Sequence, residues 1–338
     1  MSHGIVSNAM IFVFLLLIAV LACVATSMRV VVTGAGGRTG SIVVEKLLAS
    51  EAQQYIKSQK VSNEVLAIVR TDKSKGKLNK KLLSSLLLLI KNKLDPILDK
   101  LIVIKTSNLI AGNSQLVDTF KGYNKLIICT SAVPKIYVTS IMKILLFKFL
   151  GIFTNIFDKI TRKSEPTIQP MRPQFYFGAN GSPYNVDWLG TKDQIDAAKA
   201  AGIDHVVLLS SMGGTQPDNF LNTIGKVDTD ELSGNILVWK RKAEEYLMKS
   251  GLKYTIIHPG GLTDKGDESK EVILGVDDEL LKEKARTISR SDVANVCIQS
   301  LYCDSAINRS IDIISRDTGK ATSDWNLFFS SSNKNCKY

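Results

Sequence analysis

The sequence predicts an α/β fold organised around a doubly wound parallel sheet. The clearest sign is the stretch from Arg29 to Thr33, a β-branched run with almost no polar alternation, which is typical of a strand buried on both faces. Glycines follow at once, and apolar residues at helical spacing come next, so strand, turn and helix begin a βαβ unit. This order returns along the chain, and 338 residues suffice for one large α/β domain or two small ones.

The glycine turn after the first strand predicts a dinucleotide-binding site. Gly34 allows the tight turn, Gly37 lets the backbone approach a pyrophosphate, and Gly40 lets the helix pack closely on the strand. The free N–H groups of the first helical turn then face the anion. An ordinary strand-to-helix turn can carry the same glycines, but the flanking strand and helix favour the dinucleotide.

The end of the second expected strand, residues 64–70, indicates which cofactor binds. An acidic residue there would bind the ribose 2′-hydroxyl of NAD, whereas arginine suits the 2′-phosphate of NADP. Arg70 occupies this position, and Arg38 in the glycine turn supplies a second cation. A single arginine at a strand end is commonly just a solvated charge, but two that converge on one place favour NADP(H) over NAD(H).

The next part of the chain is expected to complete the first half of the sheet. Residues 73–100 predict a lysine-rich loop and then an apolar helix, and residues 101–104 and 125–130 predict the third and fourth strands. Ser131, Ala132 and Val133 follow the fourth strand, where the ends of parallel strands line a ligand crevice. Small residues there leave room for a ribose and a nicotinamide.

Positive charge is concentrated in one third of the chain. The net charge is +11, and residues 57–165 contain about 20 Lys and Arg against about 7 Asp and Glu. Such an excess suits a membrane surface, nucleic acid or an acidic ligand, but no basic motif interleaved with aromatic residues supports nucleic acid. Residues 135–162 mix bulky apolar residues with lysines, so they predict a basic amphipathic element on a membrane or over the active site, or a helix packed on the domain's own surface. Residues 165–182 predict an irregular segment that could cover the substrate.

The α/β rhythm returns in the second half of the chain. Helices are expected at residues 187–201, 235–250 and 291–301, with strands that begin at His205 and Tyr254 and short strands at 271–274 and 311–314. The five cysteines show no paired spacing typical of a metal or redox site, so no metal is expected. Cys129 and Cys297 lie in apolar stretches and are expected to be small core residues.

The N-terminal residues suggest targeting. Residues 10–25 form an apolar run of about 16 residues, too short for a comfortable membrane span and typical of the apolar region of a signal peptide. Residues 1–27 are therefore interpreted as a signal peptide or membrane anchor, which implies the secretory pathway or a membrane. No Lys or Arg precedes the run, and Met28 stands directly before the first strand, so a cytoplasmic or plastid location stays open.

Six motifs together carry a family resemblance. They are TGAGGRTG at 33–40, TSAVPK at 130–135, DWLGTKDQIDAAKAAG at 187–202, SSMGG at 210–214, GNILVWKRKAEEYL at 234–247 and YTIIHPGGL at 254–262. In this combination they resemble the short-chain dehydrogenase/reductase superfamily, most closely its atypical, NmrA-like branch of plant, algal and cyanobacterial NAD(P)-binding proteins. The resemblance implies one Rossmann domain at 28–325 with a small substrate-side lobe, an inserted segment at 136–182 and a tail at 326–338.

The resemblance also implies roles for individual residues. Binding of the pyrophosphate and of the 2′-phosphate region would fall to Gly34, Gly37, Arg38, Thr39, Gly40 and Arg70. Contacts near the nicotinamide and its ribose would fall to Ser131, Ala132, Val133, Pro259 and Gly260. In active members a serine polarises the carbonyl, a tyrosine donates the proton, and a lysine four residues later binds the ribose. Ser211 and Lys240 match the serine and lysine, whereas Ile236 stands where the tyrosine is expected.

Two functions are compatible with this set of residues. The first is an NADP(H)-dependent reductase of a small quinone-, flavin- or carbonyl-like acceptor, with Ser211 and Lys240 as its catalytic residues. Quinones and flavins take up protons from solvent, so they suit a site without tyrosine. The second is a catalytically silent NADP(H)-binding sensor or scaffold, which the aliphatic Ile236 favours.

Overall fold

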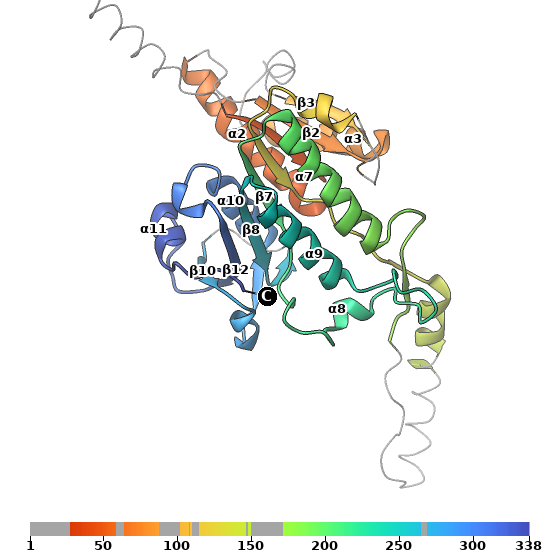
Figure 1. The fold of residues 1–338 in the computed structure, drawn as a ribbon. Helices are drawn as coiled ribbons and strands as arrows, with labels where there is room; N and C mark the ends of the chain where they lie inside the picture. Colours follow the sequence, from red (N-terminus) through yellow and green to blue (C-terminus); the bar gives the residue numbers. More distant parts are fainter. Residues whose placement is uncertain are drawn as a thin grey trace, which may run out of the picture.

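The computed structural model describes residues 28–58, 64–87, 102–107, 109, 115–146, 148–149, 172–264 and 269–337. Its centre is an eight-stranded sheet with the strand order β10-β12-β8-β7-β4-β1-β2-β3 (Figure 1). Neighbouring strands are parallel except β10, which pairs antiparallel with β12. The strands are β1 (Arg29–Thr33), β2 (Glu64–Val69), β3 (Ile102–Thr106), β4 (Lys125–Ile128), β7 (His205–Leu209), β8 (Lys253–Pro259), β10 (Glu271–Gly275) and β12 (Arg309–Arg316).

Helices cover both faces of the sheet. In β1, Val30 and Val32 pack into the core on one face and Val31 into the core on the other, which explains the unbroken β-branched run. The first core also contains residues of α2, α3 and α10, and the second contains residues of α5, α7 and α9. In Figure 1, α7 and α9 lie on one face of the sheet and α2 and α10 on the other. These helices are α2 (Arg38–Ser58), α3 (Asp72–Leu87), α10 (Arg290–Gln299), α5 (Leu116–Phe120), α7 (Gly190–Ala201) and α9 (Ile236–Lys249).

The strand order reverses between β1 and β4. From β1 the chain moves outward through β2 to β3, then returns to β4 and continues the other way through β7, β8 and β12. The loops after β1 and β4 therefore diverge at the carboxyl edge of the sheet, where doubly wound folds have their ligand crevice. The predicted doubly wound parallel sheet is confirmed.

Some expected boundaries were wrong. The lysine-rich segment predicted as a loop from residue 73 is helical from Asp72. Leu78 and Leu82, one turn apart, are buried against the sheet, whereas Lys80 is exposed and Lys81 pairs with Glu45 of α2. Lysine is itself a good helix former. The helix expected from Asp187 is preceded by a π-helical turn, η1 (Tyr184–Leu189), which brings Asp187 into a buried position.

Part of the inserted segment is ordered around a short hairpin. Residues Lys135–Ile136 (β5) pair antiparallel with Phe175–Tyr176 (β6), so the segment predicted as irregular contains a strand. A helix at 138–146 follows β5 and leaves Met142, Leu145 and Leu146 at least 60% exposed. Residues 150–171, which belong to the predicted amphipathic and covering segments, lie outside the described residues.

The two ends of the chain bear on the remaining predictions. Residues 1–27, the expected signal peptide or anchor, lie outside the described residues, and no helix within the described part is long and apolar enough to cross a membrane. In the C-terminal residues, Phe328 and Phe329 of α11 (Trp325–Ser330) are buried in the core. The proposed domain boundaries, including a tail from residue 326, stay predictions.

Candidate functional site

A cavity of about 890 Å³ opens at the carboxyl ends of the central strands. Its walls are formed by the loops that follow β1, β2, β4, β7 and β8 and by the first turn of α9. These strands flank the switch point, so the cavity occupies the expected crevice. The two cysteines predicted to be core residues have different surroundings. Cys297 is fully buried in the core as predicted, whereas half-buried Cys129 packs against the core and also lines the cavity.

The glycine turn has the tight geometry that a dinucleotide requires. Gly34 has a φ of +67°, and a Cβ there would lie 2.6 Å from the Cys129 carbonyl, so only glycine fits. A Cβ at Gly40 would lie 2.3 Å from the Gly34 carbonyl oxygen, which is the close helix–strand approach expected of the third glycine. Gly37 and Thr39 line the cavity at the N-terminus of α2, where backbone N–H groups favour an anion. The turn fits a pyrophosphate.

Arg38 lies in a cluster of three charged groups beside this turn. Its guanidinium forms an ion pair with Asp264, and Asp264 also pairs with Arg290 at 2.7 Å. The hydrogen bond from Arg38 and the charge of Arg290 hold the pKa of Asp264 below its usual value. Arg38 and Arg290 both line the cavity, so they hold two positive charges beside the predicted pyrophosphate site.

Arg70 follows β2 and lines the cavity with an exposed side chain. Thr71 and Ser74 line the same corner, and their hydroxyl oxygens lie 3.0 Å apart. Among the described residues Arg70 has no ion-pair partner, in contrast to Arg38. A guanidinium beside two hydroxyls is a donor set that suits a phosphate monoester.

A buried ion pair connects the fourth strand to α9. Lys240 Nζ lies 2.8 Å from Asp187 Oδ1, and Asp187 Oδ2 accepts a hydrogen bond of 3.0 Å from the Ala132 N–H. Ala132 is buried, so it does not line the cavity itself, but Ser131 and Val133 on either side do. Asp187 thereby fixes both the loop after β4 and the ammonium group that reaches the cavity.

Two serines follow β7. Ser211 lines the cavity, and its hydroxyl donates to the Met212 carbonyl at 3.0 Å. Ser210 also lines it, but its hydroxyl donates to the buried Glu244. Ile236 begins α9 one turn before Lys240 and lines the cavity, so an aliphatic side chain occupies the position of the expected tyrosine.

Pro259 ends β8 and Gly260 follows it, and both line the cavity. A Cβ at Gly260 would lie 2.4 Å from the Arg286 carbonyl oxygen, so the neighbouring segment requires glycine here. Most residues predicted from the sequence therefore meet at one cavity. Gly40 and Ala132 lie behind its wall, whereas its surface includes Gly34, Gly37, Arg38, Thr39, Arg70, Ser131, Val133, Ser211, Lys240, Pro259 and Gly260.

The sequence reasoning missed Asp187, Asp264 and Arg290. Arg290 could have been found from the sequence, because it is the first residue of α10. A cation at the N-terminus of a helix interacts unfavourably with the helix dipole, which suggests that the arginine has a role outside the helix. Asp187 lies at the start of a quoted motif and is 2% exposed, but burial of a carboxylate cannot be seen in the sequence.

Comparisons with known proteins agree with this geometry. Residues 172–304 match the family model described as NAD(P)H-binding. A chloroplastic protein of Arabidopsis thaliana with uncharacterised activity is 37% identical over 307 residues, which cover 89% of this chain and 74% of the relative. Sanguinarine reductase of Eschscholzia californica is 35% identical over 310 residues, 90% of this chain and 95% of the relative. A putative NAD-dependent epimerase/dehydratase from Bacillus halodurans has the same fold, with a TM-score of 0.52 and 21% identity over 86% of this chain and 96% of that one.

Proposed function

Because this chain belongs to the atypical short-chain dehydrogenase/reductase family of NAD(P)H-binding proteins, we propose that it is an NADP(H)-dependent reductase of a small quinone-, flavin- or carbonyl-like acceptor. The observation that carries the proposal is one cavity lined by the glycine turn, Arg70, Ser211 and Lys240. The name of the Eschscholzia relative, a reductase that this chain matches over 95% of its length, supports the same class of reaction.

The preference for the phosphorylated cofactor is assigned to Arg70. Arg38 is already paired with Asp264, which leaves Arg70 as the better candidate for the 2′-phosphate. Its guanidinium can donate two parallel hydrogen bonds to a phosphate, and Thr71 and Ser74 add hydroxyl donors beside it. Arg38 and Arg290 are assigned to the pyrophosphate instead.

The chemistry divides between the cofactor and the protein. When bound, NADPH supplies the hydride. Lys240, held by Asp187, would donate to the ribose hydroxyls and fix the position of the nicotinamide. The Ser211 hydroxyl would donate to the acceptor oxygen and polarise it. Ile236 cannot give a proton, so the proton would come from solvent, which suits quinones and flavins better than simple ketones.

Turnover tests the enzyme assignment. NADPH oxidation is followed by absorbance against a panel of quinones, flavins and aldehydes. We expect turnover with at least one quinone or flavin, and a loss of about 10- to 100-fold in kcat/KM in Ser211→Ala. Thr223→Ala, which removes an exposed hydroxyl outside the cavity, is the matched control and should leave kcat/KM unchanged.

Binding tests the cofactor assignment separately. In Arg70→Glu we expect NADPH to bind about 10- to 100-fold more weakly by calorimetry, while NADH affinity changes little. Lys73→Glu makes the same charge change at an exposed position that does not line the cavity. An Arg70→Glu protein that kept the wild-type ratio of NADPH to NADH affinity would contradict the assignment.

The silent NADP(H)-binding module is the second candidate, and Ile236 is the observation that favours it. In that case wild-type protein would bind NADPH without oxidising it in the presence of any acceptor on the panel. Ile236→Tyr then becomes informative, because a hydroxyl restored one turn before Lys240 would be expected to introduce carbonyl reduction.

For the compartment, we propose the plastid as the first location to test, since the Arabidopsis relative is named as chloroplastic. Organelle fractionation combined with N-terminal sequencing of the cell-derived protein separates the possibilities. Plastid enrichment supports this location. Enrichment in secretory or plasma-membrane fractions contradicts it.

For partners, we propose a weak contact between an anionic membrane surface and the helix at 138–146. Its exposed Met142, Leu145 and Leu146 lie beside the exposed Lys143, an arrangement that suits an interfacial helix. We expect co-sedimentation with anionic vesicles, reduced in Leu145→Glu but not in Leu327→Glu, which changes a similarly exposed leucine on α11. Equal co-sedimentation of both variants would contradict this contact. No nucleic-acid partner is proposed.

A further inference from the structure

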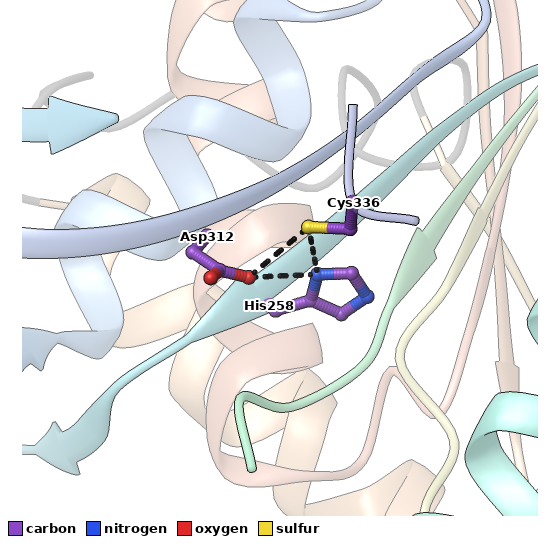
Figure 2. Close-up of side chains that lie close together, drawn as sticks. All are labelled: His258, Asp312 and Cys336. Carbon is purple, nitrogen blue, oxygen red and sulfur yellow. Dashed lines mark hydrogen bonds and ion pairs between the residues drawn. The ribbon is translucent and has the colours of Figure 1, made fainter. Parts of the chain in front are cut away.

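A second cluster of reactive side chains lies outside the lining of the cavity. His258 of β8, Asp312 of β12 and Cys336 near the C-terminal end of the described chain point toward one another (Figure 2). All three are buried, and none of them lines the cavity. The parallel register of β8 and β12 places Asp312 directly opposite His258, and the Cys336 N–H donates to the Ser310 carbonyl at 2.9 Å, which fixes the thiol beside them.

The three ligand-type atoms form a triangle of a specific size. His258 Nδ1 lies 3.1 Å from Asp312 Oδ1 and 3.6 Å from Cys336 Sγ, and Sγ lies 3.4 Å from Oδ1. Zinc binds nitrogen and oxygen at about 2.0–2.1 Å and sulfur at about 2.3 Å in tetrahedral geometry, so its ligand atoms lie about 3.3–3.6 Å apart. The observed separations are within about 0.2 Å of that triangle.

Each of the three side chains is also held by a further hydrogen bond, so that one of its ligand-type atoms faces the other two side chains. His258 Nε2 lies 3.0 Å from Glu244 Oε2, which directs Nδ1 toward the other two groups. Asp312 Oδ2 accepts from the Asp278 N–H at 2.7 Å, and Cys336 Sγ accepts from the Asp277 N–H at 3.5 Å. A histidine ligand backed by a carboxylate, and a thiolate that accepts from a backbone N–H, are outer-sphere contacts typical of metal centres.

We propose that His258, Asp312 and Cys336 bind a zinc ion, which fastens the C-terminal residues of the described chain to β8 and β12. One nitrogen, one oxygen and one sulfur ligand suit zinc better than magnesium or calcium, which prefer oxygen. Binding releases the thiol proton and, where it is present, the Nδ1 proton to solvent, and forms Zn–S, Zn–N and Zn–O bonds with no redox change, while one water of the hydrated ion stays as the fourth ligand. A nucleophilic role for Cys336 is disfavoured because its buried thiol does not reach the cavity. The proposal is independent of the reductase assignment.

The first experiment uses the untagged full chain. Protein treated with a chelator and then dialysed is titrated with Zn²⁺ and analysed by elemental mass spectrometry. We expect about one zinc per chain and a rise in Tm of roughly 4 °C or more. Co²⁺ loading should give the intense thiolate-to-cobalt charge-transfer absorption together with the visible bands of tetrahedral coordination. Wild-type protein that retains no zinc, or a cobalt form without the thiolate band, overturns the proposal.

Variants then identify the ligands. Cys336→Ser and His258→Gln should each lose most of the zinc and the zinc-dependent rise in Tm. Cys303→Ser removes another buried thiol outside the cluster and should keep both. Equal zinc content and equal Tm shift in Cys336→Ser and the wild type would overturn the site. If Cys336→Ser fails to fold, the cobalt spectra of the wild-type and Cys303→Ser proteins still test the site. The proposal requires the thiolate band in both, and its absence from either would overturn the site.

Discussion

Helix α9 carries two charged groups one turn apart on the same face of the helix, which have different surroundings. Lys240 reaches the cavity and pairs with Asp187, and its side chain is 11% exposed. Glu244 faces the sheet with a fully buried side chain, and it contacts Ser210, Arg241 and His258. Both are buried ion pairs, but only Lys240 lines a space large enough for a ligand.

The contrast between Lys240 and Glu244 shows that a buried charge does not by itself mark a functional site. Glu244 has polar partners from the serine after β7, from its own helix and from β8, so its charge is compensated within the protein. Lys240 is compensated by a single carboxylate and retains access to the cavity. Substitutions on α9 can therefore separate stability from function.

The largest effect is expected from Glu244→Gln. Removal of this charge leaves Arg241 and His258 without their shared carboxylate, which should lower the free energy of unfolding by about 3–5 kcal/mol. Denaturant unfolding measures it. Glu245→Gln, at a side chain 52% exposed on the same helix, is the control and should change stability by less than about 0.5 kcal/mol. Similar stabilities of the two variants would show that the charge of Glu244 is not needed for folding, and the contrast with Lys240 would be lost.

Lys240→Met should affect function more than folding. We expect a loss of about 100-fold in kcat/KM for NADPH oxidation, with about 1–3 kcal/mol of stability lost because Asp187 is left unpaired. Steady-state kinetics and denaturant unfolding are measured on the same preparation. Lys249→Met, at an exposed lysine near the end of α9, should change neither quantity appreciably. Full activity in Lys240→Met would make Lys240 a structural residue like Glu244.

A smaller effect is expected at a buried histidine whose ring is bonded to no carboxylate in the part of the chain that the structure describes. Burial, aided by the charges of Lys125 and Lys253, lowers the pKa of His205 to about 4. The unfolded chain, with a histidine pKa near 6.5, then binds the proton first, so stability falls as pH decreases from about 6.5 to 4, by about 2–3 kcal/mol. In His205→Gln this part of the pH dependence should disappear in denaturant unfolding across that range. An unchanged slope would mean that other groups set it.

The sequence predicts a structural feature correctly where the contacts that produce the feature lie within one turn or one helix. Gly34 and Gly40 reveal the dinucleotide turn because the positive φ of Gly34 and the approach of Gly40 to the Gly34 carbonyl both arise within the turn, although the Cys129 carbonyl beside Gly34 comes from the loop after β4. The contacts of the site are different: Arg38 and Asp264 are 226 positions apart, and no periodicity in the chain connects them. The same holds for the triad of His258, Asp312 and Cys336, since strand register brings the first two together and the C-terminal fold adds the third. Cysteine spacing alone therefore could not indicate it.

Asp264 would compete with an anion for the two arginines of the proposed pyrophosphate site. It pairs with two arginines that line the cavity, so a diphosphate bound there as proposed would exchange with a carboxylate already in place. The net binding free energy of the diphosphate would then be the difference between two sets of ion pairs. Asp264 would pair with the arginines again when the oxidised cofactor leaves. In the proposed reductase, such an arrangement would weaken retention of the cofactor and favour its exchange.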